Sequence, residues 1–264
     1  MLDVARDVGE LAVEVEAAVF EFLTRMGDNT LILGHRVSEW CGHAPVLEED
    51  IALANTALDL IGQTQLWLGL AGEVEGKGRN ADALAFLRDA AAFRNCLLVE
   101  RPNGDFGQTL TRQFLFDAWH HVMLTALTRS ADPRIAEIAA KAVKEAAYHL
   151  ERSSDLVIRL GDGTDESHKR MQRALDDIWS YVGELFIADD TDRAMVEAGI
   201  APDPASLRLE WDAIVSEVLR EATLKAPTSA YVHKGGRRGV HTEHLGYILA
   251  DMQFLQRAYP GATW

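Results

Sequence analysis

Two adjacent segments decide the fold class of this chain: FGQTLTRQFLFDAWHHVMLTALTRS at residues 106–130 and ADPRIAEIAAKAVKEAAYHLERSSDLVIRL at residues 131–160. Apolar residues recur through both segments at helical spacing, which predicts two α-helices. Asp132 is a good N-cap for the second helix and Pro133 suits its first position, while Gly161 is typical of a helix end. Because the link is short, the two helices should form an antiparallel hairpin.

A second pair of helices is predicted ahead of this hairpin. Residues 28–41 and 47–70 both have helical periodicity, and the later helix begins after Pro45 with three acidic residues that favour a helix N-terminus. Residues 7–26 form an earlier predicted helix, which Gly27-Asp28-Asn29 should end. Two hairpins joined by a long crossover make a ferritin-like four-helix bundle, and we predict that fold.

The remainder of the chain is also predicted to be helical. No alternating strand pattern is present, and helices are expected within residues 80–99 and at 165–187, 205–224 and 241–258. We therefore expect an all-α protein in which residues 1–264 form a single domain. The core bundle would cover residues 28–160, and a C-terminal helical extension, residues 165–264, would pack around it.

Composition narrows the range of partners and compartments. The net charge of −15 disfavours binding to the phosphate backbone of nucleic acids. No apolar stretch is long enough to cross a membrane, and no secretory signal precedes the first helix, so we predict a cytoplasmic protein. Cys41 and Cys96 fit a reducing compartment, and neither lies in a metal-binding spacing.

The bundle interior lacks the ligand pattern of a di-iron protein. A ferritin-like di-iron centre takes a glutamate from each of two helices and a Glu-x-x-His pair from each of the other two. No Glu-x-x-His occurs in this chain. Three residues after Asp59 stands Gly62, and three residues before His149 stands Ala146, neither of which offers a ligand. The sequence therefore predicts no metal in this chain.

The polar residues on these helices need another explanation. Buried charges must be paired or become neutral. We predict one hydrogen-bonded network at the degenerate di-iron positions, made of Arg36, Asp59, Asp117, Glu145 and His149. Two alternatives stay open, namely a metal site with unusual ligands and a set of solvated surface positions.

Two motifs near the C-terminus could have a functional role. His241-Thr242-Glu243-His244 resembles a metal motif, but it stands at a helix start, where Thr242 and Glu243 serve better as capping residues. The basic loop before it, with Lys234, Arg237 and Arg238, could meet the phosphates of a cofactor such as coenzyme A. A contact with an acidic partner and a solvated turn are the alternatives.

Several long motifs, in the same order, resemble a known family. They include Glu39-Trp-Cys-Gly-His-Ala-Pro, Leu98-Val-Glu-Arg-Pro-Asn-Gly-Asp-Phe, Phe116-Asp-Ala-Trp-His, Gly239-Val-His-Thr-Glu-His-Leu-Gly and Pro260-Gly-Ala-Thr-Trp. The chain resembles the C-type subunits of the multicomponent ring-1,2-phenylacetyl-CoA epoxidases over nearly its whole length after the first two dozen residues. The longer N-terminal stretch, residues 1–26, departs from that pattern.

This resemblance implies a role without chemistry in the chain itself. The C-type subunit of that family is a ferritin-like scaffold with no cofactor, and it pairs with a homologous catalytic A-type subunit that holds the di-iron centre. A small B-type subunit joins them, and a separate reductase with flavin and iron–sulfur centres brings electrons from NADPH. The sequence leaves a homodimer and a heterotetramer both open. An autonomous di-metal oxidase with unusual ligands is the alternative function.

The end of the chain is predicted to be packed. The last helix should lie on the bundle with the residues that recur at helical spacing, namely Leu245, Ile248, Leu249, Met252, Leu255 and Gln256. Trp264 is a large aromatic residue at the final position, which we expect to lie against either the body of the protein or a partner subunit.

Overall fold

The structure is a computed structural model that describes the backbone of residues 2–262 and the side chains of residues 15–262. It is all-helical, with no strand in the part of the chain described, which confirms the predicted fold class. The α-helices are α1 (Leu2–Ser38), α2 (Leu47–Glu75), α3 (Ala81–Phe86), α4 (Phe106–Leu127), α5 (Pro133–Gly161), α6 (Asp165–Ile178), α7 (Asp190–Glu197), α8 (Arg208–Glu221) and α9 (Glu243–Ala258). Short 3-10 helices lie at η1 (Ala90–Ala92), η2 (Trp179–Phe186), η3 (Pro204–Leu207) and η4 (Gly236–Arg238).

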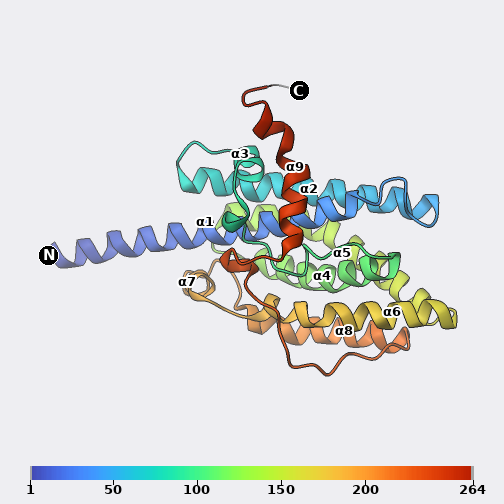
Figure 1. Cartoon of the computed structure of the whole chain (residues 1–264). Helices are drawn as coiled ribbons and strands as arrows, with labels where there is room; N and C mark the ends of the chain where they lie inside the picture. Colours follow the sequence, from blue (N-terminus) through green and yellow to red (C-terminus); the bar gives the residue numbers. More distant parts are fainter. Residues whose placement is uncertain (1, 263–264) are drawn as a thin grey trace.

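The helices pair in three successive layers (Figure 1). The hairpin of α1 and α2 lies on the hairpin of α4 and α5, with α2 against α5. The crossover between the hairpins carries α3 and η1. On the other side, α6 and α8 pack against α4 and α5, while α7 packs on α1 and α9 packs on α3 and η1. The two antiparallel hairpins and their long crossover give the ferritin-like bundle that the sequence predicts.

The predicted break at Gly27 is wrong, because α1 runs without interruption from Leu2 to Ser38. Gly27 is a packing residue: a Cβ atom there would lie 2.5 Å from Cδ2 of Leu68 on α2. The following polar residues bind the crossover, where Asp28 accepts a hydrogen bond from the Arg94 backbone N–H at 2.8 Å and Asn29 accepts one from that of Cys96 at 2.8 Å. Tertiary contacts, and not a helix end, explain this Gly-Asp-Asn motif.

Other boundaries differ by smaller amounts. The helix predicted at 165–187 becomes a 3-10 helix from Trp179 onward, and the sequence prediction does not include the short α7. The predicted start of α5 is confirmed, since the Asp132 side chain accepts a hydrogen bond from the Arg134 N–H at 2.9 Å.

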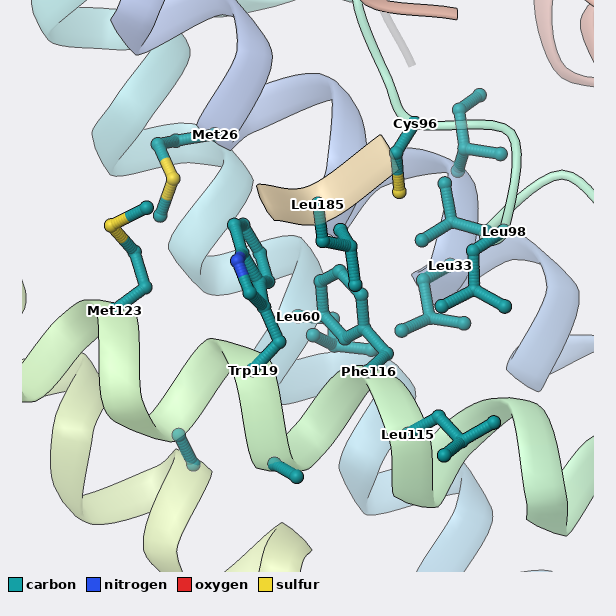
Figure 2. Close-up of a cluster of buried hydrophobic side chains, with 14 of the residues drawn as sticks. Met26, Leu33, Leu60, Cys96, Leu98, Leu115, Phe116, Trp119, Met123 and Leu185 are labelled. Carbon is teal, nitrogen blue, oxygen red and sulfur yellow. The ribbon is translucent and has the colours of Figure 1, made fainter. Parts of the chain in front are cut away.

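The hydrophobic core brings the two hairpins and η2 together (Figure 2). Phe116 and Trp119 of α4 lie in its centre, between Leu33 of α1, Leu60 of α2 and Leu185 of η2. On α9 the predicted face is confirmed as buried at Leu245, Ile248, Leu249 and Met252, but the prediction is wrong for Leu255, which is 46% exposed near the end of the helix. Within the described chain, no helix combines the length and the apolar character that crossing a membrane requires.

Candidate functional site

The interior polar group begins with two contacts that join α2 to α5. Nε2 of His149 lies 2.9 Å from Oδ2 of Asp59. One turn away, Nε2 of Gln63 donates to Oε2 of Glu145 at 2.8 Å. The two pairs follow from antiparallel packing, since a step of four residues up α2 matches a step of four residues down α5. These two contacts fix the axial position of α2 relative to α5.

Helix α4 adds Asp117, which is 1% exposed. Its Oδ1 accepts a hydrogen bond from Nε2 of Gln113 at 2.7 Å. Burial raises the pKa of Asp117 to about 6, although the charge of His149 and hydrogen bonds from Ser153 and Gln113 act in the opposite direction. A carboxyl group in such a site is neutral at acidic pH and ionises only near neutrality.

His120 lies one turn further along α4 and is 1% exposed. Its ring packs on Phe116, with a centroid separation of 5.1 Å. Burial, followed by repulsion from the His149 and His121 side chains, lowers the pKa of His120 to about 3. The imidazole is therefore neutral at every physiological pH, and neither ring nitrogen has a hydrogen-bond partner among the described residues.

These donors do not fit a di-iron centre. Such a centre needs four carboxylates and two histidines that converge from four helices. Nowhere in residues 15–262 do three or more His, Cys, Asp or Glu side chains gather in a way that could hold an ion. Asp59 and Glu145 instead direct oxygens to His149 and Gln63. In the described part of the chain, these side chains form a hydrogen-bonded polar group.

The predicted network is therefore brought together only in part. Asp59, Asp117, Glu145 and His149 all lie at the meeting of α2, α4 and α5. Arg36 lies elsewhere, at the end of α1, and its inclusion in the network is wrong. Its guanidinium donates to Oε1 of Glu39 at 3.0 Å and to the Glu100 carbonyl at 3.1 Å, so it holds the loop before α4 instead.

Three members of the group are absent from the sequence prediction: Gln63, Gln113 and His120. Each lies three or four residues from a predicted member on the same helix, and so on the same face. That spacing is the available signal. The sequence prediction relied on charged residues and metal ligands, because these residue types point to a site most directly. In this group, however, the amide side chains of Gln63 and Gln113 supply most of the hydrogen-bond donors.

The motif at His241–His244 has a structural role that differs from the prediction. Thr242 stands at the N-cap of α9, but its side chain makes no capping hydrogen bond. The buried carboxylate of Glu100 serves instead, accepting from the Thr242 N–H at 2.6 Å and facing Nδ1 of His241 at 2.9 Å. The prediction that the Thr242 side chain caps α9 is thus wrong, because the carboxylate of Glu100, which is distant in sequence, binds the start of α9 instead.

The basic loop lies beside a pocket of about 190 Å³ that also contains Glu184 and Asp189. Arg237 is engaged within the protein, donating to both carboxylate oxygens of Asp192 at 2.7 and 2.6 Å. Lys234 and Arg238 are exposed. Trp264 lies outside the described residues.

Fold and interior together define the class: a ferritin-like helical protein whose bundle holds a polar hydrogen-bonded group in its centre. Comparison with known proteins gives the family. Residues 6–264 match the family model described as phenylacetic acid catabolic protein, and the chain belongs to that family. It is similar to the C-type subunit of the 1,2-phenylacetyl-CoA epoxidase of Escherichia coli (strain K12), with 51% identity over 243 residues, which cover 92% of this chain and 98% of the relative. The resemblance inferred from the motifs is confirmed.

Proposed function

We propose that this chain is a non-catalytic structural subunit of a ring-1,2-phenylacetyl-CoA epoxidase in phenylacetate catabolism. Its partner would be an A-type subunit that holds the di-iron centre, and a small B-type subunit would join the pair. A separate reductase would supply electrons from NADPH through flavin and iron–sulfur centres. The chain itself would carry no cofactor.

The polar interior is the observation that carries this proposal. A relative named as an epoxidase subunit shares half of its residues with this chain, yet the donors described inside the bundle do not form a di-iron ligand set. A chain without the catalytic ligands contributes to an oxygenase by binding and positioning other subunits. Two long hairpins, locked together by the α2–α5 contacts, offer an extended rigid surface for that purpose.

Metal analysis and oxygen uptake test the proposal. The purified full-length chain should hold far less than one iron per chain and consume no O2 with a competent reductase and phenylacetyl-CoA. Added to its A-type subunit, it should co-purify and support epoxidation. About two irons per chain, together with turnover by the isolated chain, would instead establish the alternative, an autonomous di-metal oxidase.

Two further features belong to this proposal. Cys41 and Cys96 are both free thiols, which suits the proposed cytoplasmic location. Lys234 and Arg238 remain proposed contacts for a coenzyme A phosphate or for a carboxylate of a partner. Replacing both by alanine should weaken one of these interactions and leave the fold unchanged, since neither is buried.

A further inference from the structure

The outer face of α2 carries an apolar strip that no part of the described chain covers. Leu47, Ile51 and Leu58 are 70%, 53% and 70% exposed, although side chains of this kind are normally buried. Ala54 and Ile61 lie between and beyond them and are partly exposed. The five residues follow one another at steps of four, three, four and three, so they form one line along the helix, here called the α2 strip.

A groove of about 330 Å³ runs beside this strip, between α1 and α2. Gly34, His35 and Ser38 of α1, with Cys41 in the turn after it, form one side, and Ala54, Ala57, Leu58 and Ile61 of α2 form the other. Most of these side chains are small, and a Cβ atom at Gly34 would already lie 3.2 Å from Cδ1 of Ile61. The large side chains of the strip thus form a ridge beside a groove lined by small ones. A second helix packs on such a surface by placing its own ridge of side chains in the groove.

From these observations we propose that the α2 strip and its groove are the docking surface for a helix of the A-type subunit. The occupant is a helix because the alternating steps of four and three are the heptad spacing by which two helices pack side by side. Its own apolar residues at the same spacing would enter the groove. This inference rests on the proposed function, and it adds the location of the interface.

Charge on the flank of the strip identifies the chemistry of the partner helix. Glu48, Asn55 and Asp59 lie along one side of the strip, and the Asp59 side chain is 37% exposed. In helix pairs, the residues flanking the apolar seam face each other and set partner choice. A helix with Lys or Arg at those positions fits. A second copy of this chain, packed antiparallel over the whole strip, would place the uncharged Gly62 opposite Glu48 and would offer that carboxylate no cation.

A second exposed apolar strip follows α9, with Tyr247 at 68% and Phe254 at 63% exposure on the helix and Tyr259 at 58% just after its end. It ends beside Arg257, which pairs with Asp89 at 2.9 Å. This strip has fewer turns of continuous apolar residues than the α2 strip, and it serves as the competing surface in the experiment.

The test measures binding of the A-type subunit to variants of the full chain. Leu58→Glu places a charge in the α2 strip, and Leu47→Glu repeats the change at the start of the helix. Leu209→Glu on α8 is the matched control, because Leu209 is also an exposed leucine on a helix, at 82%. Phe254→Glu examines the α9 strip. Melting temperatures verify that each variant folds, which the exposure of the four positions predicts.

We expect both α2 variants to weaken binding at least tenfold, with Leu209→Glu and Phe254→Glu close to wild type. Glu48→Lys should weaken binding as well, more strongly at low salt. If both α2 variants bind the A-type subunit as tightly as the wild type does, the inference is wrong and the proposed function is unaffected. A wild-type chain that binds no A-type subunit overturns the proposed function itself. A homodimer that Leu58→Glu dissociates, with A-type binding intact, overturns the choice of occupant.

Discussion

Replacing Asp117 by asparagine should stabilise the protein at neutral pH and have little effect in acid. Asp117 is 1% exposed, and its Oδ1 atom accepts a hydrogen bond from Gln113. The Oδ1 atom of asparagine can accept that same bond. The substitution therefore keeps the shape and one partner of the side chain, and it removes the charge that forms above the pKa of Asp117.

The magnitude follows from the change in pKa between the unfolded and folded states. Burial moves the pKa of Asp117 from 3.8 to about 6, which corresponds to about 3 kcal/mol. A carboxyl group whose pKa is raised by folding stabilises the folded state fully below pH 3.8 and loses that contribution as pH rises through about 6. At pH 8 the wild type thus carries the whole penalty of about 3 kcal/mol, and at pH 4 it carries roughly 0.6 kcal/mol.

Urea unfolding at pH 4 and pH 8 measures this difference. The gain in unfolding free energy for Asp117→Asn should be larger at pH 8 than at pH 4 by about 2.5 kcal/mol. Any constant effect of the new amide group cancels in that comparison. Asp155→Asn is the control, because Asp155 is an exposed aspartate on α5. A gain for Asp117→Asn that is equal at both pH values would refute the assignment of a raised pKa.

Three further changes test the fold and its interior. Gly27→Ala should destabilise the protein by about 1–3 kcal/mol, because the new Cβ meets Leu68; thermal melting measures it, and an unchanged melting temperature would show that α1 and α2 are further apart. Arg88→Met should cost about 3–5 kcal/mol, since it leaves the Asp28 carboxylate buried without its cation, and denaturant unfolding of the Arg88→Met, Asp28→Leu double variant should recover much of the loss. Folding lowers the pKa of His120 to about 3, so the wild type loses unfolding free energy as the pH falls below 6.5. His120→Phe removes this loss, so its unfolding free energy relative to wild type should be higher at pH 5 than at pH 7.5 by about 2 kcal/mol. Equal pH profiles of unfolding free energy for the two proteins would contradict this.

The fold is predictable from the sequence because its signals are local. The start of α5 illustrates this, since Asp132 and Pro133 define it within a few residues. The error at Gly27 has the opposite origin. A glycine followed by two polar residues ends a helix in most contexts, and only the proximity of α2 and of the crossover shows why those residue types are needed in mid-helix.

The candidate site is predictable only as far as helical spacing reaches. The apolar neighbours of Asp59, Glu145 and His149 predict that these side chains point inward, and they do lie between α2 and α5. Arg36 shares the same local pattern, yet it lies at the end of α1 and bonds Glu39. Helical spacing indicates the face of a helix that a residue occupies. Its position along the bundle axis depends on the axial shift between packed helices, which helical spacing does not give.

Asp59 connects the interior of the bundle to the proposed docking surface. Its carboxylate faces Nε2 of the buried His149, while its side chain is 37% exposed on the flank of the α2 strip. A basic residue of a docked helix would therefore approach a carboxylate that already has an interior partner. Asp59 and Gln63 bind α5 at two successive turns of α2. These contacts therefore also fix the position of Leu58 along the bundle axis. If a partner helix docks as proposed, the polar interior would serve assembly, because it keeps the register of the helix whose other face would meet the partner.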